Sequence, residues 1–145
     1  GGMYTQRLEV DALTPREEGF DGVTAYARTK RAMVVLSEQL SERLQGRGIA
    51  VHAMHPGWAD TPGVERSIPG FWKLTQRILR SPAEGADTVI WLASCDKAQD
   101  QSGRFWFDRK ARSTHLLGKR AAPGERERLW DALHRWGQMS EAIDA

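Results

Sequence analysis

The chain has 145 residues, of which 40% are hydrophobic and 28% are charged, so it fits one globular unit and is not a fibrous or low-complexity chain. Its 21 Lys and Arg against 19 Asp and Glu leave a formal net charge of +2, which does not call for a nucleic-acid partner. The single cysteine, Cys95, permits no disulfide within the chain, and no apolar run is long enough to cross a bilayer. We therefore expect a cytoplasmic protein without a metal site, a transmembrane segment or bound nucleic acid.

The first predicted regular element is a long helix. Residues 10–22 are polar and contain proline and glycine, which indicates a surface loop. From Val23 onward the pattern is helical, and apolar side chains recur at spacings of three and four, at Met33, Leu36, Leu40 and Leu44. Gly46 and Gly48 are expected to end this helix, one of them in a left-handed conformation.

Two short strands and a second helix follow. Residues 49–55 are apolar at both parities and predict a strand covered on both faces, and residues 103–108 predict another. Residues 57–70 are rich in glycine and proline and predict irregular chain, followed by a short amphipathic piece over 71–80. Ser81 begins a helix whose expected buried face comprises Ala86, Val89, Ile90 and Ala93. Strands joined by helices pair in parallel, so the pattern predicts an α/β fold.

The end of the chain predicts one more amphipathic helix, which ends near Gly137. Its apolar positions are Leu129, Trp130, Leu133 and Trp136. A parallel sheet of two or three strands is narrow for 145 residues, and the first residue is Gly1 rather than methionine. We therefore expect that part of the sheet lies outside this sequence.

The segment Tyr26-Ala27-Arg28-Thr29-Lys30 contains the main candidate for catalysis. Residues four apart share a helix face, so the phenol of Tyr26 and the ammonium of Lys30 can approach each other. A neighbouring cation favours the phenolate, and such a phenol can exchange a proton with a carbonyl or alcohol oxygen. By itself the spacing is weak evidence, because it occurs by chance in roughly one chain of this length in four or five. The alternative is a helix surface that merely contains a tyrosine.

A second element strengthens the case. Pro56-Gly57-Trp58-Ala59-Asp60-Thr61 begins thirty residues after Tyr26 and follows the first predicted strand. Ligands of open parallel sheets bind at the carboxyl ends of the strands. A Pro-Gly turn there lets the backbone approach a flat ligand, and Thr61 offers a hydroxyl to an amide group.

In this order and spacing, the two motifs resemble the C-terminal half of the short-chain dehydrogenases/reductases (SDRs), over about residues 1–120. The segment 55–64 and several shorter blocks are similar to the SDR family member 12 group, whereas retinol-dehydrogenase-like members share fewer of them. The resemblance implies a Rossmann-type, doubly wound parallel sheet, present here only as its C-terminal half. Residues 121–145 match no feature of the family, so we predict an SDR part over 1–120 and a helical extension over 121–145.

The resemblance also implies roles for individual residues. Tyr26 would be the general acid/base, and Lys30 would hold the ribose hydroxyls of NAD or NADP and favour the phenolate. The residues expected to face the nicotinamide are Pro56, Gly57, Trp58 and Thr61. Those expected to cover the substrate, or alternatively to belong to the core, are Ile68, Phe71 and Trp72. The implied activity is hydride transfer between NAD(P) and a small-molecule carbonyl or secondary alcohol.

Two departures from the family pattern limit this expectation. The sequence has no Gly-x-x-x-Gly-x-Gly loop to bind the pyrophosphate, and the family's catalytic serine would fall immediately before Gly1. We therefore expect the 145 residues alone to be inactive, with an open sheet edge that pairs with a second copy into a homo-oligomer. The alternative is a non-catalytic scaffold or interaction domain that binds no cofactor.

Overall fold

The computed structural model describes residues 2–14, 18–67, 69–75, 78–115 and 121–137. In chain order, the described elements are the 3₁₀ turns η1 (Gly2–Thr5) and η2 (Val10–Ala12), then α1 (Gly22–Arg43), β1 (Ala53–Met54), α2 (Pro62–Ser67), α3 (Pro69–Thr75), α4 (Pro82–Ser94), α5 (Asp96–Gln99), β2 (Phe105–Phe107), β3 (Lys110–Arg112) and α6 (Glu125–Gly137).

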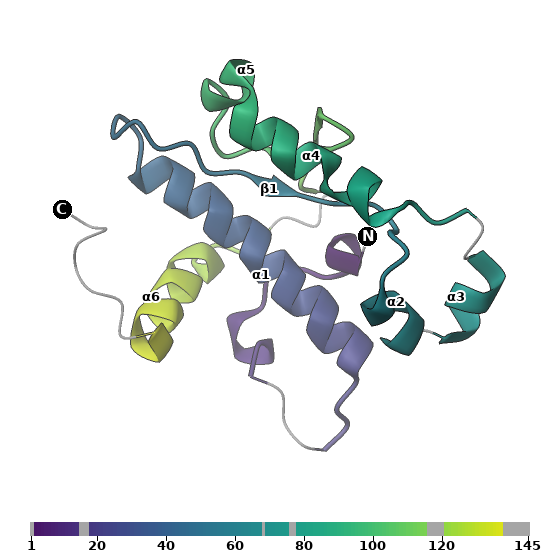
Figure 1. The fold of residues 1–145 in the computed structure, drawn as a ribbon. Coiled ribbons are helices and arrows are strands. Elements are labelled where there is room, and N and C mark those ends of the chain that lie inside the picture. Colours follow the sequence, from purple (N-terminus) through teal and green to yellow (C-terminus); the bar gives the residue numbers. More distant parts are fainter. Residues whose placement is uncertain (1, 15–17, 68, 76–77, 116–120, 138–145) are drawn as a thin grey trace.

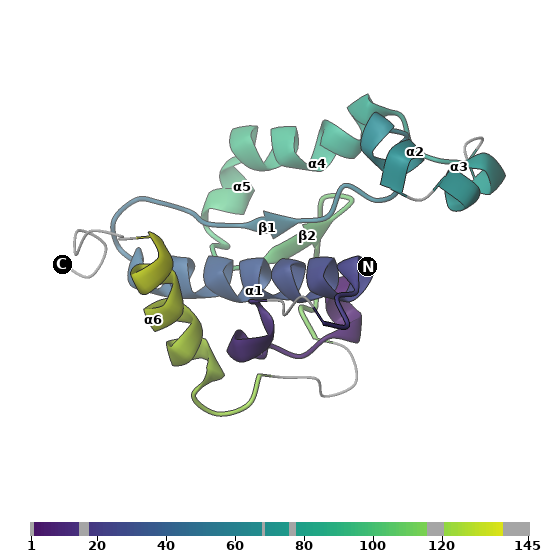
Figure 2. The same ribbon diagram turned by 90° about the horizontal axis from the view of Figure 1, so that it is seen from below.

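The strands β1 and β2 lie between two layers of helices. They pair in parallel, with Ala53 opposite Phe105 and Met54 opposite Trp106. Helices α1 and α6 lie on one side of the strands, and α4 and α5 lie on the other (Figures 1 and 2). The chain therefore has the expected α/β architecture, with helices on both faces of a parallel pair.

The sheet is mixed, because its third strand is antiparallel. β3 pairs with β2 through Phe107 opposite Lys110, which leaves Asp108 and Arg109 as a two-residue turn. Their φ angles are +52° and +55°, as a tight turn of type I′ requires. The prediction of a purely parallel sheet is therefore wrong at this edge. The hairpin was missed because the Asp-Arg pair lacks the glycine that usually indicates such a turn.

Helix α1 forms where it was expected, but its buried face differs from the prediction. The Asp21 carboxylate accepts hydrogen bonds from the amides of Val23 and Thr24, both at 3.1 Å, and so caps the helix. Met33 is 51% exposed, whereas Ala32 and Val35 are buried. The helix packs against the sheet on one side and against other elements on the opposite side, so two of its faces are covered. The spacing of apolar residues alone did not show which positions belong to these faces.

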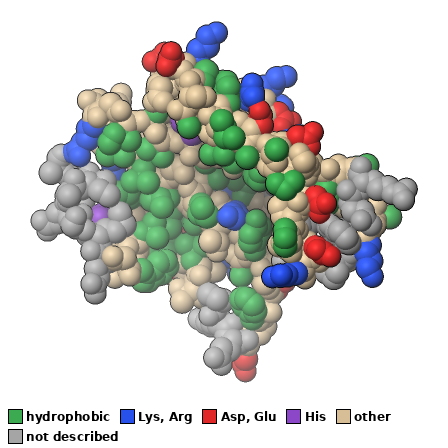
Figure 3. All heavy atoms as spheres, in the orientation of Figure 1, with side chains coloured by type: hydrophobic (Ala, Val, Ile, Leu, Met, Phe, Trp, Pro, Cys, Tyr) green, Lys and Arg blue, Asp and Glu red, His purple; other side chains and the backbone are tan. Residues whose placement is uncertain are grey.

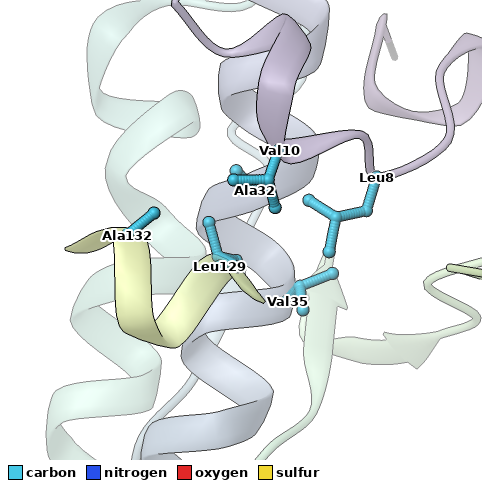
Figure 4. Close-up of a cluster of buried hydrophobic side chains, with 6 residues drawn as sticks. All are labelled: Leu8, Val10, Ala32, Val35, Leu129 and Ala132. Atoms are coloured by element: carbon cyan, nitrogen blue, oxygen red, sulfur yellow. The ribbon is translucent and has the colours of Figure 1, made fainter. Parts of the chain in front are cut away.

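The largest cluster of buried apolar side chains joins the two ends of the described chain (Figure 4). It comprises Leu8, Val10, Ala32, Val35, Leu129 and Ala132. Val10 therefore belongs to the core and not to a surface loop. Helix α6 forms as predicted and is described as far as Gly137. Arg126 ties it to α1 through ion pairs with Glu38 and Glu42, at 2.9 and 2.7 Å.

Helix α4 starts as the sequence predicts. The Ser81 hydroxyl accepts from the Glu84 amide at 3.2 Å, and the Glu84 carboxylate accepts from the Ser81 amide at 2.7 Å, which is a capping box. The expected buried face is wrong, because Val89 and Ile90 are 50% and 63% exposed. The residues that α4 buries are Gly85, Thr88 and Leu92. Figure 3 shows the face carrying α1 and α4, which is rich in hydrophobic side chains.

Two further expectations about local structure need correction. Strand β1 contains only Ala53 and Met54, and Ile49 is 52% exposed, so the strand expected over 49–55 is shorter and less covered. Residues 57–70 are not wholly irregular, because α2 begins at Pro62 and α3 at Pro69. Proline suits the first turn of a helix, where its missing N–H is not needed.

Candidate active site

Tyr26 and Lys30 occupy the second and third turns of α1 and form a pair on its surface. The Lys30 Nζ lies 5.4 Å from the centroid of the Tyr26 ring, and Tyr26 is 62% exposed. The spacing of four residues therefore places the cation beside the phenol, as expected. Lys30 also contacts the Met33 sulfur, at 3.7 Å.

The backbone of η1 approaches the same part of α1. A Cβ built on Gly2 would lie only 3.3 Å from the Cβ of Ala27, the neighbour of Tyr26. A larger residue at position 2 would push η1 away from the helix, so Gly2 permits this close packing.

The Pro-Gly turn directly after β1 is held by a histidine. The Gly57 amide donates to Nδ1 of His55 at 2.8 Å, and Gly57 has a φ of +80°. Burial is the main cause that lowers the pKa of His55, and the charge of Arg80 lowers it further. His55 is therefore neutral near pH 7, with its ring proton on Nε2 because Nδ1 accepts a hydrogen bond.

The N-terminal half of α1, which contains Tyr26, lies at the same end of the molecule as the segment that follows β1. Helix α1 runs antiparallel to β1, so its N-terminal half lies at the end where β1 finishes and leads to α2 (Figures 1 and 2). Trp58 is 50% exposed in this segment, and Thr61 immediately precedes α2, whose Glu65 amide donates to the Thr61 carbonyl at 3.1 Å.

Arg80 and Asp108 belong to this region, and sequence reasoning missed both. Arg80 forms a two-pronged ion pair with Asp108, one contact of which is Nη2 to Oδ2 at 2.8 Å. The hydrogen bond with Arg80 is the main cause that holds the pKa of Asp108 below its usual range. The Arg80 backbone also pairs with the segment after β1, donating to the Trp58 carbonyl at 2.9 Å. The available signal was the opposite charges of Arg80, which immediately precedes the Ser81 cap of α4, and Asp108, which directly follows β2.

An open cavity of about 550 Å³ lies beside the Pro-Gly turn. Its lining includes Gly57 and Trp58 of the predicted nicotinamide-side residues, together with Tyr4, Arg80, Phe105 and Phe107. Tyr26 and Lys30 are not among the described residues that line it. Ile68 lies outside the described residues, and so do the side chains of Phe71 and Trp72, although both residues belong to α3.

Within the described parts of the chain, no group of three or more His, Cys, Asp or Glu side chains could hold a metal ion. No helix in those parts is both long and apolar enough to traverse a bilayer.

The proteins to which this α/β chain is similar are named as dehydrogenases or reductases. Human dehydrogenase/reductase SDR family member 12 is 46% identical over 143 residues, which cover 95% of this chain and 44% of that protein. The bovine protein of the same name is 45% identical, with 92% and 42% covered, and human retinol dehydrogenase 14 is 31% identical, with 79% and 35% covered. No protein-family model and no solved structure matches the chain.

The chain belongs to the short-chain dehydrogenase/reductase superfamily, and it aligns with the C-terminal part of these relatives. It spans less than half the length of the curated relatives named above. The family resemblance predicted from the sequence is thereby confirmed.

Proposed function

We propose that these 145 residues carry the proton-transfer and nicotinamide-facing part of an NAD(P)-dependent oxidoreductase that acts on a carbonyl compound or a secondary alcohol. The observation that supports this most is the exposed Tyr26 phenol with the Lys30 ammonium 5.4 Å from its ring. Both residues belong to the N-terminal half of α1, which lies at the end of the molecule where β1 finishes (Figures 1 and 2). Open parallel sheets bind their ligands at that end of their strands.

In this proposal Tyr26 is the general acid/base. When a carbonyl is reduced, its phenol donates a proton to the carbonyl oxygen, and when an alcohol is oxidised, the phenolate accepts the hydroxyl proton. The Lys30 cation stabilises the phenolate and offers N–H donors to the ribose hydroxyls of the cofactor. A bound nicotinamide supplies or accepts the hydride.

The residues after β1 fit the nicotinamide end of such a cofactor. Gly57 presents no side chain, and the half-exposed indole of Trp58 gives a flat apolar surface against which a ring can pack. Pro56 would pack beside them, and the Thr61 hydroxyl would bind the carboxamide. The glycine-rich pyrophosphate loop is not in this sequence. We therefore expect the 145 residues alone to show no saturable binding of NADH or NADPH and to be inactive.

The test compares turnover and cofactor binding in the complete product of the gene. Tyr26→Phe should lower kcat by about 10²- to 10⁴-fold while cofactor affinity changes little, because only the proton donor is lost. Lys30→Met should weaken cofactor binding, and Lys97→Met, on α5 across the sheet, serves as the matched control. A reduced cofactor's fluorescence reports binding.

Three outcomes would contradict parts of this proposal. Turnover that survives Tyr26→Phe would remove Tyr26 from the mechanism. A complete product that binds neither reduced cofactor would favour the alternative of a non-catalytic scaffold. Saturable binding by the 145 residues alone would instead show that the dinucleotide site is misplaced.

A further inference from the structure

The cavity beside the Pro-Gly turn has an apolar floor and walls. Phe105 and Phe107 of β2 line it, and the side chains of Trp58 and Ile78 border it while they are 50% and 81% exposed. The Tyr4 hydroxyl donates to the Ser113 carbonyl at 2.7 Å, and this bond ties η1 to the chain that follows β3. A volume of about 550 Å³ with this lining suits a small molecule with an apolar body.

One of the two arginines that line the cavity is already neutralised. The Arg80 guanidinium is bound by both oxygens of Asp108, and it stacks over the Phe107 ring with Cζ 4.9 Å from the centroid. A Cβ at Gly57 would lie 2.9 Å from its Nε, so the absence of a side chain at Gly57 leaves room for Arg80. Arg80 therefore shapes the cavity without adding net charge.

The second arginine, Arg112, keeps its full charge. It lies opposite Phe105 in the β2–β3 ladder, with Cζ 5.9 Å from the Phe107 ring centroid. In the described part of the chain, no ion pair or hydrogen bond links its guanidinium to a carboxylate. His55 also lines the cavity but is neutral near pH 7, as described above. The charged groups at the cavity thus leave one unbalanced positive charge, on Arg112.

We propose that this cavity binds a monocarboxylate with an apolar chain, and that Arg112 selects it by binding the carboxylate while the chain lies on Phe105 and Phe107. The planar guanidinium matches the two oxygens of a carboxylate. A single unbalanced charge matches a monoanion better than a dianionic phosphate ester. Because Gly57 and Trp58 border the cavity, the ligand would lie beside the nicotinamide-facing segment. Its assignment as the substrate, an oxo or hydroxy fatty acid, rests on the function proposed above, whereas its binding does not.

The experiment is calorimetric titration of the complete product of the gene at pH 7.5 with octanoate, octanamide and octyl phosphate. Octanoate should bind about tenfold or more tightly than octanamide, which has the same apolar chain without the charge. Arg112→Met should abolish this preference and leave octanamide binding unchanged, and Arg112→Lys should retain part of it. Lys110→Met removes an equal charge from the same strand outside the cavity lining, so it should behave like the unmodified chain.

The proposal is overturned if octanoate and octanamide bind equally or not at all, or if Arg112→Met keeps the preference. Octyl phosphate binding more tightly than octanoate would replace the carboxylate with a phosphate ester as the ligand. Circular dichroism of each variant confirms that the fold is retained. These titrations need neither cofactor nor turnover, so they can fail while the Tyr26→Phe test succeeds, and the reverse.

Discussion

Replacing Gly57 with alanine tests the contact between the Pro-Gly turn and Arg80. Gly57 has a φ of +80°, and a Cβ there would lie 2.9 Å from Nε and 3.0 Å from both Cδ and Cζ of Arg80. The Arg80 side chain cannot swing aside freely, because Asp108 holds its guanidinium and the Phe107 ring lies beneath it. The substitution therefore strains the backbone and displaces an anchored side chain.

The backbone strain and the steric crowding both lower the stability of the Gly57→Ala variant. A left-handed conformation costs a residue with a Cβ about 1–2 kcal/mol. Crowding against the Arg80 stem adds about 1 kcal/mol or more. Gly57→Ala should therefore lower the free energy of unfolding by about 2–3 kcal/mol, with the backbone and the steric contact contributing in similar measure.

Gly46→Ala is the matched control, because Gly46 has a φ of +81° and nothing lies within 4 Å of a Cβ built there. Urea unfolding followed by circular dichroism should show a smaller loss for Gly46→Ala than for Gly57→Ala. In an Arg80→Ala background, Gly57→Ala should cost no more than Gly46→Ala, since the crowded atoms are gone. Equal losses for the two glycines in the unmodified chain would refute the argument.

Two further predictions concern the core and the response to pH. Leu129→Ala should lower the free energy of unfolding by about 2–5 kcal/mol, because Leu129 is fully buried between α1 and η2. Urea unfolding should show a smaller loss for Leu133→Ala, because Leu133 is only partly buried. Burial lowers the pKa of His52, whose Nδ1 accepts a hydrogen bond from the Trp106 indole at 3.1 Å. At low pH the unfolded chain therefore binds more protons than the folded chain. The free energy of unfolding should fall as the pH drops below about 6.5. His52→Gln should make the free energy of unfolding less dependent on pH between 7.5 and 5.5, and an unchanged dependence would show that His52 is not responsible.

Features that depend on neighbouring residues in the chain could be predicted from the sequence. The capping box at Ser81 forms as expected, and Gly46 and Gly48 both adopt positive φ after α1. The Tyr26–Lys30 spacing correctly predicts a pair on one helix face, because the helix repeat itself brings residues four apart together. The parallel pairing of β1 with β2 also follows from the order of strand and helix.

Features that depend on distant parts of the chain were missed. The turn at Asp108 and Arg109 contains no glycine. The side chain of Asp108 pairs with Arg80, and that of Arg109 pairs with Asp87, so both partners lie more than twenty residues earlier in the chain. Val89 looks like a core residue in the sequence, yet it is half exposed because no described element covers that side of α4.

The sequence alone therefore determined where α4 begins and that Tyr26 and Lys30 share a face of α1. These properties arise from hydrogen bonds and side-chain contacts within a few turns of the same segment. The tertiary structure alone decided which face of α1 and of α4 is buried, and that Arg80, Gly57 and Arg112 meet around one cavity. Burial and ion pairing depend on what packs opposite a residue, and residues far apart in the chain supply those partners.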